Sequence, residues 1–154
     1  EKVGKNWTKR DYGGERSWED ALATYKLALL CAQIKSERMR VVAGLLHHIA
    51  WLYRHKGERE QENRFLRHAL DAYVNVYETE EANLNNARLM YLIGELNRRL
   101  GRYHEAVRWF SRVVHDERIV DSAMIRASRE QWAATREDMA AAQMEPPDGM
   151  GLQP

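Results

Sequence analysis

Two amphipathic helices that meet at Gly101 are the clearest pattern in the sequence, and they occupy the stretch from Ala87 to Val114. Before the glycine, apolar or small residues recur at steps of three and four, so they share one face of a helix: Met90, Ile93, Gly94 and Asn97. After it, a second stripe has the same period: Tyr103, Ala106, Val107, Phe110, Val113 and Val114. A glycine at a helix end favours the left-handed conformation that stops the helix. The pattern therefore predicts a helical hairpin that turns at Gly101.

Gly94 lies on the apolar face of the first of these helices. A glycine in an exposed helix costs about 1 kcal/mol relative to alanine, so we expect it to let a neighbouring helix approach closely. Ala106 is the small residue that we expect opposite it. The spacing of Ile93-Gly94, Gly101, Tyr103, Ala106 and Phe110 resembles the tetratricopeptide repeat. Met90, Asn97 and Arg118 depart from that pattern, so the repeat is divergent.

The same spacing occurs a second time, 44 residues earlier in the chain. Leu46, Ile49, Ala50 and Tyr53 correspond to the first stripe, and Gly57 corresponds to Gly101. Leu66, Ala69 and Tyr73 then point toward the core from the following helix. We expect helices over about 17–35, 36–56, 60–77, 87–100, 103–114 and 120–142. The fold class predicted is therefore all-α, a tetratricopeptide-like α-solenoid of about six antiparallel helices. We expect a linker or arm over 1–16, one helical domain over 17–142 and a disordered tail over 143–154.

The first and last of these helices have distinct patterns. In the first, Trp18, Ala21, Leu22, Tyr25, Ala28, Leu29 and Ala32 form one apolar stripe, and Leu27, Leu30, Cys31 and Ile34 widen it. So wide a face predicts contacts on two sides of the helix, with Cys31 as a small buried side chain. In the last helix we expect Ala123, Met124, Ala127, Gln131 and Ala134 to face inward, with a polar outer face typical of a terminal cap.

Composition limits the classes of function. The formal charge is +1 over 154 residues, which argues against a general affinity for nucleic acid. No apolar run approaches the ~20 residues of a membrane span and no signal peptide is evident, so the expected location is cytoplasmic. One cysteine excludes an intrachain disulfide framework and a multi-cysteine zinc site. Because the sequence opens on Glu1, we expect it to be a fragment.

Three strings together resemble a bacterial family of uncharacterised proteins, a domain of unknown function. They are GERSWEDALATYKLALLCAQI at 14–34, AWLYRHKGEREQENRFLRHALDAY at 50–73 and YLIGELNRRLGRYHEAVRWF at 91–110. The resemblance covers about Gly14 to Arg129. It implies that this helical part follows an N-terminal segment with paired cysteines of the metal-binding kind, which is not in this sequence. It implies no activity.

Metal binding and catalysis find little support in the sequence. His47, His48 and His55 lack the i, i+4 spacing of a helical zinc pair, and His48 and His55 are separated by about 10 Å along a helix. No phosphate-binding loop, Gly-x-Ser-x-Gly motif or evident Cys/His pairing occurs. Carboxylates at 58, 60 and 62 suit a helix start, where the dipole favours them. We therefore expect no enzyme, no metal and no cofactor.

The best candidate site is a groove for a protein or peptide. In a helix-pair solenoid, the first helix of each pair lines the concave side with the face opposite its core stripe. That face carries His47, His48, Trp51, Arg54 and His55 in one helix and Arg88, Tyr91, Glu95, Arg98 and Arg99 in the other. Aromatic rings beside guanidinium groups suit an extended, acidic partner. The alternative is that Glu95 pairs with Arg98 and Arg99 within its own helix, as residues three and four apart do.

A second function stays open. Lys2, Lys5, Lys9 and Arg10 with Trp7 form a basic arm that could follow a phosphate backbone. This alternative predicts a nucleic-acid-associated module, with the arginine-rich groove contributing.

Overall fold

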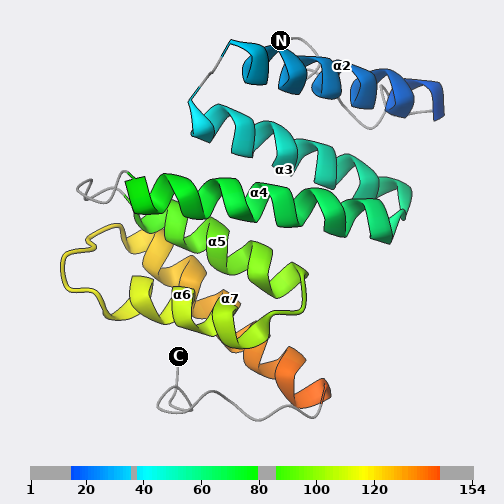
Figure 1. Cartoon of the computed structure of the whole chain (residues 1–154). Helices are drawn as coiled ribbons and strands as arrows, with labels where there is room; N and C mark the ends of the chain where they lie inside the picture. The colour runs from blue at the N-terminus through cyan, green and yellow to red at the C-terminus, as the bar shows by residue number, and fades with distance from the viewer. Residues whose placement is uncertain (1–14, 36–37, 80–85, 143–154) are drawn as a thin grey trace. The chain divides into compact units, whose positions relative to one another are not determined.

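The computed structural model describes residues 15–35, 38–79 and 86–142, and within these ranges the chain is all-α, with no strand. Figure 1 shows the helices, and their bounds are α2 (Glu15–Ile34), α3 (Met39–Lys56), α4 (Arg59–Thr79), α5 (Ala87–Arg99), α6 (Tyr103–His115) and α7 (Ser122–Ala141). The all-α class is confirmed. Helix α2 includes the last two residues of the expected arm, 15 and 16. The rest of that arm, residues 36–37 at the start of the second expected helix, and the expected tail lie outside the described residues.

The contacts divide the chain into two compact units, an N-terminal unit that ends at Ala69 and a C-terminal unit that begins at Leu70. Helix α4 contributes residues to both units. Each unit is described by itself below.

In the N-terminal unit, α2 and α3 form a hairpin around Trp18. The Trp18 indole N–H donates a hydrogen bond to the Leu52 carbonyl at 2.6 Å, and its ring meets Tyr53 edge-on with centroids 5.7 Å apart. Burial of these rings with Ala21 and Ile49 makes one apolar core, to which α4 adds Phe65. The residues expected to face this core from α3 are buried, as predicted: Leu46, Ile49, Ala50 and Tyr53.

The second apolar face predicted for α2 is largely exposed. Leu27 is 62% exposed and Ile34 is 73% exposed, and Leu30 is also exposed. The prediction that Cys31 is buried is wrong, because its side chain is exposed on this same face. Periodicity showed that the helix has two apolar sides, but only one of them packs against α3.

In the C-terminal unit, α5 and α6 pack closely because Gly94 has no side chain. A Cβ at Gly94 would lie 2.6 Å from Cε1 of Phe110, well inside van der Waals contact. The close approach predicted for this glycine is therefore confirmed, but the residue that fills the space is Phe110 rather than Ala106. Ala106 is fully buried in the same cluster, together with Val107 and Trp132.

The two predicted glycine turns have the same geometry. Gly57 and Gly101 both have positive φ, 81° and 76°. At the first turn, the Glu58 N–H donates to the Tyr53 carbonyl, and at the second the Arg102 N–H donates to the Asn97 carbonyl. A bond that spans five residues past a left-handed glycine is the Schellman helix ending. The 44-residue correspondence read from the sequence is therefore present in backbone geometry.

Helix α7 faces the core with a different side from the one predicted. The buried residues are Ser128, Trp132, Thr135 and Met139. Of the residues expected there, Ala123 is exposed, and Met124, Ala127, Gln131 and Ala134 are half-buried. The small alanines suggested a face, but the large Trp132 and Met139 bury more apolar area and determine the orientation.

Candidate partner-binding site

In the N-terminal unit, the predicted site residues of α3 lie on one side of that helix. We call His47, His48, Trp51, Arg54 and His55 the α3 surface. Its centre is Trp51, which is 44% exposed although it is one of the largest apolar side chains in the chain. The Trp51 ring stacks on His55 with centroids 5.6 Å apart and an angle of 21° between the planes. Arg54 is exposed three residues along the helix, within reach of the same ligand.

His48 is held beside this centre by α2. Its imidazole stacks on Tyr25 with centroids 5.1 Å apart and an angle of 16° between the planes. Although much of the residue remains exposed, the burial of the ring lowers the pKa of His48 from its ordinary value. The α3 surface is therefore aromatic, with the guanidinium of Arg54 as its cation, and three of its rings, those of His48, Trp51 and His55, take part in stacking contacts. Rings fixed in this way lose little freedom when a ligand packs on them.

In the C-terminal unit, α7 packs against the side of α5 that carries Arg98. The Arg98 Nε donates to the Asp138 carboxylate at 2.7 Å, and an Nη donates to the Gln131 Oε1 at 2.8 Å. The Arg98 side chain is thus held by two groups on another helix, rather than by Glu95 within its own helix.

The other predicted site residues of α5 differ in their contacts and in their exposure. Arg99 pairs with Glu95 at 3.2 Å, which is the intrahelical pair that the sequence offered as an alternative. Tyr91 packs beside Phe110, and burial, with the Glu95 carboxylate nearby, raises the pKa of Tyr91. Arg88 is exposed. The structure therefore brings Tyr91 and Arg98 together with α7, and Glu95 with Arg99.

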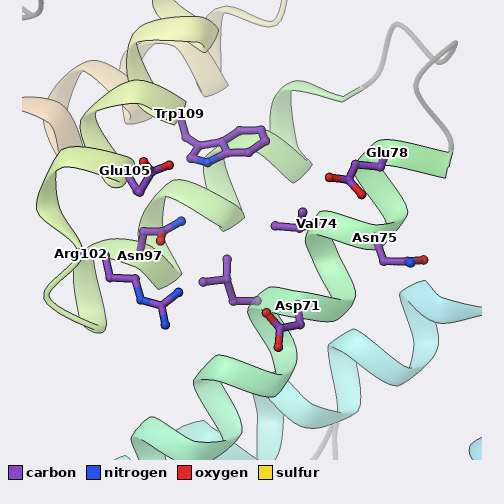
Figure 2. A pocket seen from close by; sticks show the side chains of 9 residues that line it. Asp71, Val74, Asn75, Glu78, Asn97, Arg102, Glu105 and Trp109 are labelled. Atoms are coloured by element: carbon purple, nitrogen blue, oxygen red, sulfur yellow. The ribbon is translucent and has the colours of Figure 1, made fainter.

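A groove that the sequence did not predict lies between α4 and the hairpin of α5 and α6, within the C-terminal unit (Figure 2). One wall comes from α4: Leu70, Asp71, Val74, Asn75 and Glu78. The other wall comes from the hairpin: Asn97, Arg102, Glu105 and Trp109. Its volume is about 460 Å³, within the range of ligand-binding clefts. We call this the α4–α6 groove.

The position of Trp109 in this groove is determined by its neighbours. Tyr77 meets the indole edge-on, with centroids 4.9 Å apart and an angle of 85°. The Arg112 guanidinium lies 4.7 Å from the ring centroid, a cation–π contact from the same helix. The groove therefore has a rigid aromatic end.

Neither a metal site nor a membrane span is found in the part of the chain that the structure describes. No group of three or more His, Cys, Asp or Glu side chains there is arranged to hold a metal ion. None of the helices there is both long and apolar enough to cross a membrane. Glu60 and Glu62 lie in the first turn of α4, where the helix dipole favours carboxylates.

Helices α3 and α5 end on left-handed glycines, and exposed aromatic and arginine side chains lie on the surface of the chain. These features place the chain in the class of all-α helical proteins. The particular family follows from the comparison of sequences. The chain belongs to the family described as uncharacterized proteins conserved in bacteria (DUF2225), whose model matches residues 1–135. The resemblance seen in the three strings is confirmed. No curated protein and no solved structure matches the chain.

Proposed function

We propose that this chain is a non-catalytic, cytoplasmic, tetratricopeptide-like scaffold that binds a protein or peptide through the α3 surface. The repeated glycine turns at Gly57 and Gly101 support the tetratricopeptide-like part of this proposal. The partner we expect is an extended segment that carries carboxylates. The proposal includes a neighbouring domain of a longer protein as a source of such a segment.

The observation that carries the proposal is the exposed, stacked Trp51 beside Arg54. Tryptophan and arginine are the residues most enriched among those that dominate binding energy at protein interfaces. An indole held on His55 offers a flat apolar surface, and the Arg54 guanidinium can form two parallel hydrogen bonds to a carboxylate. A partner with an apolar side chain next to Asp or Glu would satisfy both groups.

Arg98 has a smaller part in this proposal than the sequence suggested. Because Arg98 donates to Asp138 and Gln131, a substitution there would disturb the packing of α7. The proposal therefore rests on α3. The basic arm of the nucleic-acid alternative lies outside the described residues, and none of the described contacts favours it.

The double variant Trp51→Ala with Arg54→Glu tests this proposal. We expect its affinity for a short glutamate-rich peptide to fall about tenfold or more, equal to about 1.4 kcal/mol, because it loses the apolar surface and reverses the charge. Fluorescence anisotropy of a labelled peptide at low salt measures the change.

A matched control is Leu27→Ala with Arg64→Glu, in the same unit. It also removes one exposed apolar side chain and reverses one exposed arginine, but on α2 and α4 rather than on α3. We expect the control to bind like the parent chain. If both double variants lose affinity equally, the attraction is general to the chain and the assignment to α3 is wrong. Absence of peptide binding by the parent chain would also contradict it.

A further inference from the structure

The α4–α6 groove is acidic on a chain whose formal charge is +1. Three carboxylates line it, those of Asp71, Glu78 and Glu105, against the single guanidinium of Arg102. Glu105 is already paired with Arg108 at 2.6 Å. Within the described residues, neither Asp71 nor Glu78 has an ion-pair partner. The α4 wall therefore presents two unneutralised carboxylates.

Asn97 supplies a polar acceptor on the hairpin wall of the groove. Asn97 is only 4% exposed, yet it lines the groove, and Figure 2 shows its amide directed into the open space. Its Nδ2 donates to the Ile93 carbonyl at 2.9 Å. No described residue donates a hydrogen bond to its Oδ1. Among the described residues, this oxygen is not one of the fully buried atoms that lack a partner, so it is open to the groove and can accept a hydrogen bond from a ligand or from water.

We propose that the α4–α6 groove is a second binding site, and that it takes an arginine side chain from an extended segment of a partner protein. A guanidinium has five N–H donors in one plane, enough to bond a carboxylate through two of them and to reach a further acceptor. Asp71 or Glu78 supplies the carboxylate, and the Asn97 Oδ1 supplies the further acceptor.

The apolar part of the groove fits the rest of an arginine side chain. Val74 lies on the α4 wall between the two carboxylates, Leu70 lies beside Asp71, and Trp109 closes one end. The three-carbon stem of arginine packs on apolar surface while its charged end stays in polar surroundings. A metal ion does not fit these ligands, because the described residues contain no group arranged to hold one.

This site is independent of the α3 surface proposed above. It lies in the C-terminal unit and prefers cations, whereas the α3 surface lies in the N-terminal unit and prefers carboxylates. The Trp51→Ala with Arg54→Glu variant should therefore bind an arginine peptide like the parent chain. Loss of arginine-peptide binding in that variant would contradict a separate site.

Three labelled peptides of identical sequence, differing at one central residue, test the ligand. The central residue is arginine, lysine or citrulline, and binding to the whole chain is measured by anisotropy at low salt. We expect the arginine peptide to bind most tightly, lysine to bind more weakly because it cannot form the planar paired bond, and citrulline to bind least because it has no charge. Equal binding of all three, or of arginine and lysine, would overturn the proposal, and so would no binding of arginine.

Two variants then test the groove. Asp71→Asn with Glu78→Gln removes both unneutralised carboxylates, and we expect the arginine peptide to bind about tenfold more weakly or worse. The matched control is Glu117→Gln with Glu137→Gln, which removes two exposed carboxylates of the same unit outside the groove. An equal loss in the control would show that charge alone is responsible and would overturn the site.

Arg102→Gln tests the site through a gain, which misfolding cannot imitate. The Arg102 guanidinium repels an incoming cation from the hairpin wall. Its removal should tighten binding of the arginine peptide by about two- to fivefold, the size expected of an exposed charge interaction. Weaker binding, or no change, would contradict the proposed position of the ligand.

Discussion

At the scale of single residues, Gly94 controls how closely α5 and α6 approach. We expect Gly94→Ala to lower the free energy of unfolding by about 1–3 kcal/mol, because its methyl group would overlap the Phe110 ring and force a shift in the core. Urea denaturation followed by circular dichroism measures this. Gly44→Ala in α3 is the control, since a Cβ there meets nothing within 4 Å. Gly44→Ala should stabilise by up to about 1 kcal/mol through helix propensity. Equal effects at both positions would contradict the packing role.

His48 gives the N-terminal unit a dependence on pH. Burial lowers its pKa in the folded chain below the ordinary value of 6.5, so the unfolded chain takes up a proton more readily. The stability that neutral His48 contributes is complete above pH 6.5 and is lost as the pH falls through the lower, folded pKa.

The change in urea midpoint between about pH 7.5 and about pH 5 measures this effect. We expect His48→Gln to reduce the fall in stability, and the same substitution at exposed His68 to leave it as in the parent chain. A larger fall in His48→Gln than in the parent would show that the sign is wrong.

At the scale of helices, the two glycine turns should respond alike. An L-residue in the left-handed region costs about 1–2 kcal/mol, so Gly57→Ala and Gly101→Ala should each destabilise by about that amount. Thermal unfolding of each variant measures the loss. A loss at only one turn would contradict the structural equivalence of the two helix ends, which share the same hydrogen bond past the glycine.

The helices themselves were predictable because their apolar residues follow the helical period and their ends carry glycine. Leu46, Ile49 and Tyr53 are buried as the spacing required. Periodicity does not say which partner covers a face. It therefore assigned Cys31 to the interior, where the structure has it exposed, and it placed Ala106 rather than Phe110 against Gly94.

The candidate sites were harder to predict than the helices. The residues of the α3 surface lie on one side of their helix, as their spacing indicated. On α5, the contact of Arg98 with Asp138 joins residues 40 apart in sequence, which no local pattern reveals. The α4–α6 groove draws its walls from three helices, and its polar residues look like an ordinary solvated face when α4 is read alone.

At the scale of the whole molecule, the two units carry surfaces of different charge. The N-terminal unit presents an aromatic and cationic surface on α3, and the C-terminal unit presents an acidic groove between α4 and the hairpin. The formal net charge of +1 therefore combines local surfaces of positive and of negative charge. The two proposals together predict that the chain binds an acidic segment on α3 and an arginine-bearing segment in the α4–α6 groove, each independently of the other.

Trp51 provides the most direct test of the claim that α3 binds acidic segments. The chain has 5 tryptophans, so its ¹⁵N spectrum contains a small, assignable set of indole N–H signals. On titration with the glutamate-rich peptide, the account predicts that the Trp51 signal shifts while those of buried Trp18 and Trp132 stay in place. The arginine peptide should instead move the signal of Trp109. An acidic peptide that binds while the Trp51 signal stays unchanged would contradict the account.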